Sequence, residues 1–317
     1  MGIVAPRRMR RGALFIHFDL AIHSPMSAVP GTAATLPSDD LRRAASRRRF
    51  PLSPLGIARQ LARYGNLIRV LTRTQSLGRY KGTLLGPLWS VLTPLALLFA
   101  FSFVFGRVCN ANWDGAEGAL SYTLPLYVSL VTFFFFAEVV SNGPTIVVSN
   151  RNFVTQMAFP LEVLPLVRTL STALRALPNY GIIAICLLVS LGRIPPTFCL
   201  LPVVLLPMFL FALGLAYLLS AGGVFVRDLA QPIGVLVRTT LYLSAVFYPI
   251  SKLSGVARAF AEFNPIARIM EDTRAVAVFG QWPGAWPLLA TLGGGAAFAW
   301  LGYVVFMSLR GRFADVI

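Results

Sequence analysis

The chain has 317 residues, of which 56% are hydrophobic and only 13% are charged, and its mean hydropathy is +0.70. Such an apolar composition excludes an ordinary soluble domain and indicates a protein that crosses a membrane several times. The net charge of +16 is unevenly distributed, because residues 1–83 hold 15 Lys and Arg against three acids. The three cysteines have no metal-ligand spacing, so we predict no metal site.

The segment before the first long apolar run has two parts. Residues 1–52 alternate basic clusters with Pro- and Gly-containing sequence, which predicts a disordered basic tail. Its expected partner is the anionic lipid of the cytoplasmic leaflet rather than nucleic acid. Residues 53–83 have a helical period, and their apolar stripe consists of Leu61, Tyr64, Ile68 and Leu71. We predict an amphipathic helix in the membrane interface, either an anchor or a lever that conveys motion from a cytoplasmic partner.

Residues 84–309 contain six apolar windows that are long enough to cross the roughly 30 Å hydrocarbon core, which takes about 20 residues per helix. The predicted spans are 84–106, 120–141, 164–191, 198–222, 233–250 and 286–309. The predicted fold is therefore an all-α membrane protein with six transmembrane helices, followed by a cytoplasmic tail, residues 310–317. An even number of spans puts both termini on one side, and the excess of Lys and Arg places that side in the cytoplasm. Counted close to the membrane alone, the predicted cytoplasmic segments hold eight Lys and Arg and the predicted external segments hold six.

The connection between the second and third spans is longer than a tight turn. Gly143-Pro144 ends one span and Phe159-Pro160 precedes the next, which leaves about 15 residues of moderate polarity. That length allows one short cytoplasmic helix parallel to the membrane, which is suited to transmitting force. An ordinary connecting loop is the alternative.

The connection between the fifth and sixth spans is also unusual. Residues 251–285 are apolar enough to contact lipid, but Asn264-Pro265 divides them and their charges prevent a single span. We predict two short external helices that re-enter the outer leaflet, where the backbone has to satisfy its own hydrogen bonds. Glu271 and Arg274, three positions apart, are expected to form an ion pair.

Four segments with polar and aromatic residues border the predicted spans. The first consists of Arg79-Tyr80-Lys81, Thr83, Leu85-Gly86, Leu88-Trp89 and Pro94. The others are Asn152-Phe153 with Phe159-Pro160 and Leu164-Pro165; Phe225 with Arg227 and Asp228; and Ser244, Tyr248-Pro249, Asn264-Pro265, Glu271 and Arg274. In this order they resemble the permease subunits of type-two ABC exporters, over roughly residues 60 to 275. The most similar subgroup exports lipid-linked polysaccharides, namely O-antigen, capsule and teichoic acid.

The chain departs from this family pattern at three places. Thr155 and Gln156 stand where the coupling loop usually carries lysine, so the docking contacts are expected to differ. Phenylalanines 133 to 136 replace a tryptophan near the middle of the second span. The family's Ser-Pro-Val is Ser-Ala-Val here, and Ala245 removes a kinking proline.

The resemblance implies roles for particular residues. Those that couple the membrane helices to an ATPase are Asn152, Phe153, Phe159, Pro160, Arg227 and Asp228. A gate where the chain enters the membrane consists of Arg79, Tyr80, Lys81, Gly86 and Trp89. The external re-entrant segment carries Asn264, Pro265, Glu271 and Arg274. The family also implies a homodimer of the permease with two copies of a P-loop ATPase, which binds ATP and Mg, so no cofactor is expected in this chain.

Polar and aromatic side chains inside the spans are candidates for a translocation pathway. Arg168, Thr172, Arg175 and Asn179 recur on one face of the third span, which we expect to face the bundle interior because intramembrane charge is costly. Arg175 is predicted to meet either Glu138 or the pyrophosphate of a lipid-linked substrate, with snorkelling or helix pairing as the alternative.

Aromatic and small residues suggest two further features. Tyr122, Tyr242 and Tyr248 offer flat faces for sugar rings, although interface anchoring and helix packing are commoner roles for such rings. In the last span, a face of small residues predicts close helix packing; it consists of Gly293, Gly294, Gly295, Ala297 and Ala299.

The sequence lacks the motifs of several classes of enzyme. It contains no G-x-x-x-x-G-K-[ST], so the chain is not expected to hydrolyse ATP by itself. It also contains no H-E-x-x-H or G-x-S-x-G. A membrane glycosyltransferase would gather acids near one interface, whereas Asp39-Asp40 lies in the tail and Glu271-Asp272 has cations nearby. The remaining alternative is a type-two permease for a drug, haem or lipo-oligosaccharide, which shares the six-helix plan.

Overall fold

The computed structural model describes residues 53–78, 88–104, 113, 122–154 and 159–316, and the predicted tail, 1–52, lies outside them. The described residues belong to one compact unit, Arg49–Ile317. The α-helices are α2 (Pro54–Arg63), α3 (Gly65–Gly78), α4 (Trp89–Phe101), α5 (Thr123–Asn142), α6 (Arg151–Val154), α7 (Val163–Leu191), α8 (Leu201–Phe225), α9 (Ala230–Leu243), α10 (Gly255–Phe263), α11 (Pro265–Ala277), α12 (Ala285–Leu309) and α13 (Phe313–Val316). Short 3₁₀ helices are η3 (Gly143–Thr145), η4 (Val148–Asn150), η5 (Pro196–Leu200), η6 (Arg227–Leu229), η7 (Ile250–Lys252) and η8 (Arg310–Arg312).

The predicted interface helix is two helices in the structure. Ser53 caps α2, because its side chain accepts a hydrogen bond from Gly56 N at 3.2 Å. At Tyr64 the backbone leaves the helical region, with φ −92° and ψ 15°, and α3 begins at Gly65. The apolar period runs on through this break, which is why the pattern indicated one helix. Ile57 is buried while the arginines of α2 are exposed, as an amphipathic helix requires.

Within the described residues, four helical stretches are long and apolar enough to cross a membrane. They are Thr123–Thr145, Val163–Leu191, Pro196–Phe225 and Ala285–Arg312. These stretches coincide with the second, third, fourth and sixth predicted windows. Helix α7, in the third predicted window, ends at Gly192, whose φ of +67° is a left-handed conformation that glycine adopts without strain.

The first and fifth predicted windows contain shorter helices. α4 has 13 residues and α9 has 14, which is about 20 Å of helix each at 1.5 Å per residue. Residues 79–87 and 105–112, which flank the described segment that contains α4, lie outside the described part of the chain. α9 stops at Leu243 because the chain turns at Ala245, which has a φ of +53°. The count of six spans therefore remains a prediction.

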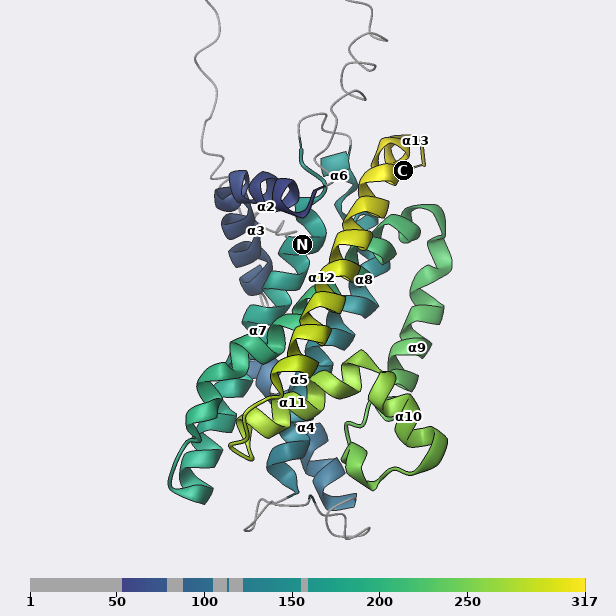
Figure 1. Ribbon diagram of the computed structural model, residues 1–317. Coiled ribbons are helices and arrows are strands. Elements are labelled where there is room, and N and C mark those ends of the chain that lie inside the picture. The colour runs from purple at the N-terminus through teal and green to yellow at the C-terminus, as the bar shows by residue number, and fades with distance from the viewer. Residues whose placement is uncertain (1–52, 79–87, 105–112, 114–121, 155–158, 317) are drawn as a thin grey trace, which may run out of the picture. The chain divides into compact units, whose positions relative to one another are not determined.

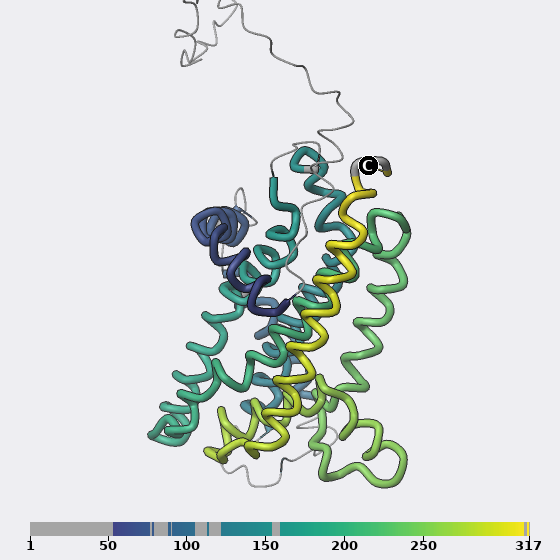
Figure 2. Tube along the Cα trace, turned by 45° about the horizontal axis from the view of Figure 1, so that its top comes forward, coloured from purple at the N-terminus to yellow at the C-terminus, as the bar shows by residue number. Residues whose placement is uncertain are grey.

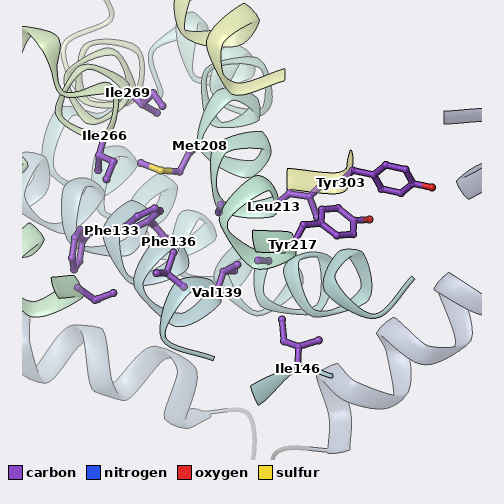
Figure 3. Packing of buried hydrophobic residues seen from close by; sticks show 14 of the residues in the cluster. Phe133, Phe136, Val139, Ile146, Met208, Leu213, Tyr217, Ile266, Ile269 and Tyr303 are labelled. Atoms are coloured by element: carbon purple, nitrogen blue, oxygen red, sulfur yellow. The ribbon is translucent and has the colours of Figure 1, made fainter. Parts of the chain in front are cut away.

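Helix α5 lies at the centre of the unit. Of its apolar window 78% is buried, against 17% for the window in α12. Figure 3 shows Phe133 and Phe136 of α5 in one cluster with Met208 of α8 and with Ile266 and Ile269 of α11. The central helix is thus enclosed by its neighbours, whereas α12 leaves most of its surface uncovered by this chain.

Helices α8 and α12 pack closely along their length. A Cβ atom at Gly302 would overlap the carbonyl oxygen of Gly214, so glycine is what allows the two backbones to approach. Gly295 also faces α8, as the predicted small-residue face requires. Gly293 and Gly294 have open space beside them, so that part of the prediction is wrong: the packed face turns away from them and continues to Gly302.

The two ends of the unit carry different elements. Figure 1 shows α2, α6 and α13 toward one end and α10 and α11 toward the other, and Figure 2 also shows the end of α12 far from the α10–α11 segment. At the first end, η3 packs against α8 so tightly that a Cβ atom at Gly223 would overlap the carbonyl group of Pro144. At the second end, the break at Asn264-Pro265 separates two short helices, as predicted. Their place in the outer leaflet stays a prediction.

Candidate coupling and pathway sites

The loop between α5 and α7 carries four of the predicted coupling residues. Asn152 and Phe153 lie in α6; the first is exposed and the second is half-buried. The rings of Phe153 and Phe159 stack with centroids 4.4 Å apart and planes 16° apart, which joins the two sides of the loop. Pro160 is buried and leads into α7. In the described part of this loop, an aromatic pair therefore joins α6 to the residues before α7, and Asn152 is exposed.

The other two predicted coupling residues, Arg227 and Asp228, lie in η6. Both side chains are exposed. The η6 turn contacts the end of α8, and so does η3, which follows α5. The close approach at Gly223 holds η3 against this end of α8. The structure thus brings the two predicted coupling segments to the same end of the unit.

A residue that the sequence reading did not single out, Glu162, lies beside the coupling loop. Its side chain is only 1% exposed. Its Oε1 accepts a hydrogen bond from Gln60 Nε2 at 2.9 Å, and its Oε2 pairs with Arg310 Nη1 at 2.8 Å. An acid in an apolar stretch needs partners, and this was the signal available in the sequence. The partners lie 102 and 148 positions away, where no local pattern identifies them.

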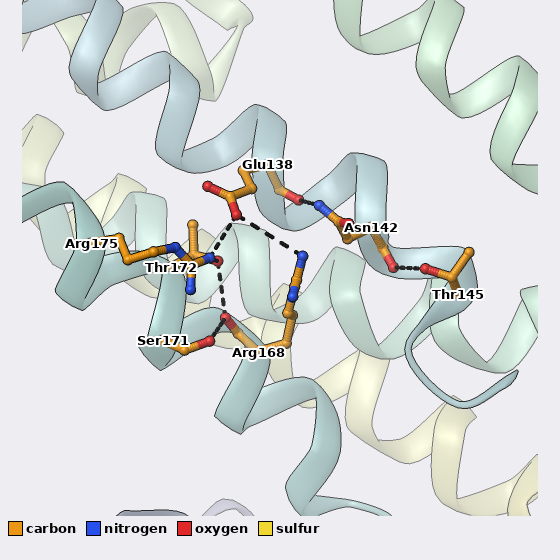
Figure 4. Close-up of polar contacts among 7 residues, drawn as sticks. All are labelled: Glu138, Asn142, Thr145, Arg168, Ser171, Thr172 and Arg175. Carbon is orange, nitrogen blue, oxygen red and sulfur yellow. Dashed lines mark hydrogen bonds and ion pairs between the residues drawn. The ribbon is translucent and has the colours of Figure 1, made fainter. Parts of the chain in front are cut away.

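The polar stripe of α7 meets Glu138 of α5 (Figure 4). Arg175 Nη2 donates hydrogen bonds to Glu138 Oε1 at 2.6 Å and to Thr172 Oγ1 at 3.0 Å. Arg168 Nη2 lies 4.0 Å from the same carboxylate oxygen. Thr172, Arg175 and Asn179 are buried, so the stripe faces the interior as predicted. Of the two partners predicted for Arg175, the structure shows Glu138.

A cavity of about 230 Å³ borders this ion pair, between α4, α5 and α7. Trp89 and Pro94 line it from α4, Phe134 from α5, and Arg175 with Asn179 from α7. The cavity therefore joins a predicted gate residue, Trp89, to a predicted pathway residue, Arg175. The other predicted gate residues lie outside the described residues; they are Arg79, Tyr80, Lys81 and Gly86.

The three pathway tyrosines gather elsewhere, around the turn that follows α9. Tyr122 is buried and donates its hydroxyl to Phe247 O at 3.2 Å. Tyr248 donates to Tyr242 O at 2.9 Å, and the rings of Tyr242 and Phe247 lie 5.7 Å apart. Tyr122 precedes Glu138 by sixteen positions of helix, or about 24 Å. The predicted pathway residues therefore form two sites that are separated along α5.

Arg274 connects the segment of α10 and α11, which is predicted to be external, to the rest of the unit. Its side chain is 1% exposed, and its Nη1 donates to Ser129 Oγ of α5 and to Ala245 O, both at 2.8 Å. Its Nη2 donates to Glu271, which confirms the predicted ion pair. The guanidinium also lies over the ring of Trp113, 4.5 Å from the centroid. No role was predicted for Trp113, because a single tryptophan between two predicted spans is part of no recognisable sequence pattern.

Asn264 and Pro265 begin α11. The Asn264 side chain accepts a hydrogen bond from Ile266 N at 3.0 Å, and Pro265 takes a first-turn position where no donor is lost. Asn264 Nδ2 also lies 3.4 Å from Leu243 O and from Ser244 Oγ. This asparagine therefore caps one helix and ties it to the end of another, α9.

Comparison with known proteins agrees with this arrangement. A family model described as ABC-2 type transporter matches residues 66–277. The O-antigen export system permease protein RfbA of Myxococcus xanthus is 27% identical over 268 residues, which cover 82% of this chain and 99% of that protein. Two proteins of the same name from Klebsiella pneumoniae are each 23% identical over 254 residues, or 80% of this chain and 95% of theirs.

Proposed function

Because the chain belongs to the ABC-2 type transporter family, we propose that it is the permease subunit of an ATP-driven polysaccharide exporter. The substrate is a lipid-linked glycan, such as O-antigen or capsule, moved from the cytoplasmic side to the outer face of the cytoplasmic membrane. The observation that carries this proposal is the similarity to O-antigen export permeases over nearly their whole length.

The proposed assembly contains two copies of the permease and two copies of a P-loop ATPase. The partner binds ATP and Mg and hydrolyses the nucleotide, since this chain has no nucleotide-binding loop of the G-x-x-x-x-G-K-[ST] type. α4 and α9 supply the first and fifth of six spans, both termini are cytoplasmic, and α10 with α11 re-enters the outer leaflet. The grouping of α6 and η6 at the end that carries α2 and α13 supports a single ATPase-docking surface there.

In this proposal, residues 151–160 with Arg227 and Asp228 receive the movement of the ATPase. The pair of Arg175 and Glu138 beside the cavity is where the pyrophosphate of the substrate exchanges with the carboxylate. Tyr122, Tyr242 and Tyr248 line the route farther out. A phosphate group suits the guanidinium at this position, because charge-assisted hydrogen bonds strengthen in a low dielectric.

The proposal is tested by deleting the gene and measuring surface glycan with a specific antibody. We expect surface glycan to disappear and lipid-linked glycan to accumulate inside the cell. The wild-type gene is expected to restore export, provided that the partner ATPase retains its P-loop lysine. Normal surface glycan, together with loss of drug resistance or of haem-dependent enzymes, would assign the chain to another cargo.

Arg175 offers a finer test of the pathway. Arg175→Ala is expected to lower export while the protein still reaches the membrane in the folded state, as measured by its yield and by size-exclusion chromatography. Lys252→Ala, which changes an exposed cation, is the control and is expected to leave export unchanged. Unchanged export and unchanged folding in Arg175→Ala would remove this residue from the pathway.

A further inference from the structure

One buried carboxylate is shared by segments that are far apart in the chain. Glu162 lies in the turn that begins α7. Gln60 of α2 donates to its Oε1 at 2.9 Å, and Arg310, just after α12, donates to its Oε2 at 2.8 Å. Tyr217 of α8 donates its hydroxyl to the Glu162 carbonyl at 2.9 Å. The start of α7 is thereby bonded to α2, to α8 and to the end of α12.

Arg310 also ties Glu162 to the coupling loop. Its Nη2 donates to the carbonyl of Phe159 at 3.3 Å, and the ring of Phe159 stacks on Phe153 of α6. The two oxygens of a carboxylate belong to one rigid group, so they cannot move independently. A displacement of residues 151–160 therefore moves α2 and the end of α12 together, unless one of these hydrogen bonds breaks.

The attachment of α2 depends strongly on this carboxylate. Within the described residues, α2 contacts the bundle through the Gln60–Glu162 hydrogen bond and through the apolar side chains of Ile57 and Leu61. Much of the helix is exposed, as its arginines Arg59 and Arg63 show. A helix held in this way opens locally at a small cost compared with the core.

From this geometry we propose that Glu162 is the positioning residue of a joint between the coupling loop, the amphipathic helix α2 and the last spanning helix. A displacement of the coupling loop then reaches both α2 and the end of α12 through one side chain. Its use during transport rests on the proposed export function, whereas the physical linkage does not.

Hydrogen exchange of the full-length permease in lipid nanodiscs tests the linkage. Gln60→Ala removes one donor, and we expect amide exchange in α2 to accelerate about tenfold, the effect of losing one hydrogen bond to a charged group. Glu162→Gln is expected to accelerate exchange both in α2 and at residues 310–312. The control is Glu262→Gln, the same change in an exposed pair with Arg258 of 2.8 Å, which is expected to leave both regions unchanged.

A swapped pair separates this joint from a general packing role. In the double variant Gln60→Glu with Glu162→Gln, an amide again faces a carboxylate at α2, but Arg310 has lost its ion pair. We expect exchange in α2 to return to the wild-type rate while residues 310–312 remain fast. Equally faster amide exchange in every helix, or unchanged amide exchange in α2 in the single variants, would contradict the proposed joint at Glu162.

The transport role is tested in the complex with its ATPase by the number of ATP molecules hydrolysed per glycan exported. We expect this ratio to rise in Gln60→Ala and Glu162→Gln, and to stay at the wild-type value in Glu262→Gln. An unchanged ratio in both variants, beside a working wild type, would overturn the transmission of motion. Absence of ATP-driven export by the wild type would instead overturn the proposed function.

Discussion

At the scale of single residues, three arginines that are buried or half-buried in the described part of the chain end on carboxylates. The pairs are Arg175 with Glu138, Arg274 with Glu271, and Arg310 with Glu162. Removing water from a charge costs several kcal/mol, which a well-placed counter-charge and further hydrogen bonds offset. The first and third pairs therefore constrain which elements lie side by side, in addition to any role in transport. The second pair lies within α11, and Arg274 reaches other elements through Ser129 and Ala245.

Arg274 is the most enclosed of these cations. Arg274→Gln is expected to lower the free energy of unfolding by about 3–5 kcal/mol, because Glu271 then loses its partner and Ser129 and Ala245 lose a shared donor. Unfolding in detergent, followed by circular dichroism, measures the change. Arg258→Gln breaks an exposed pair and is expected to cost about 0–1 kcal/mol. Similar losses in the two variants would contradict this account of Arg274.

At the scale of helices, close packing of α8 on α12 depends on individual glycines. Gly302→Ala is expected to destabilise the protein by about 1–3 kcal/mol, because the added methyl group forces the backbones apart at Gly214. Gly293→Ala, on the same helix but beside open space, is expected to be neutral or slightly stabilising. Thermal unfolding of the two variants measures the difference. Equal stability would mean that the helices separate here at no cost.

Much of the helix plan could be predicted from the sequence, because long apolar windows and Gly or Pro breaks are local signals. The ends of α5, α7, α8 and α12 follow such signals closely. The division of α2 from α3 at Tyr64 could not be predicted, since the apolar period continues across it. The site was predicted less well: the Glu271–Arg274 pair is local, whereas the partners of Glu162 come from the two ends of the chain.

At the scale of the whole molecule, the six-span plan assigns a side of the membrane to each loop. Cys199 is exposed in η5, between α7 and α8, which the plan places outside. With Cys109 and Cys186 replaced by alanine, we expect a membrane-impermeant maleimide to label Cys199 in intact spheroplasts. Asp228→Cys, with Cys199 also replaced by alanine, is expected to react after lysis alone. Labelling of Cys199 after lysis alone would reverse the topology.

The bond between Arg274 and Ser129 also bears on the order in which the protein is made. These two residues are 145 positions apart, so about 7–30 s of synthesis separate them at the usual rate of 5–20 residues per second. During that interval α5 is already available to enter the bilayer, while α11, which covers part of it, does not yet exist. Helix α5 therefore remains partly uncovered until the later segments are made. A factor that shields its polar side chains during this interval would increase the yield of folded permease.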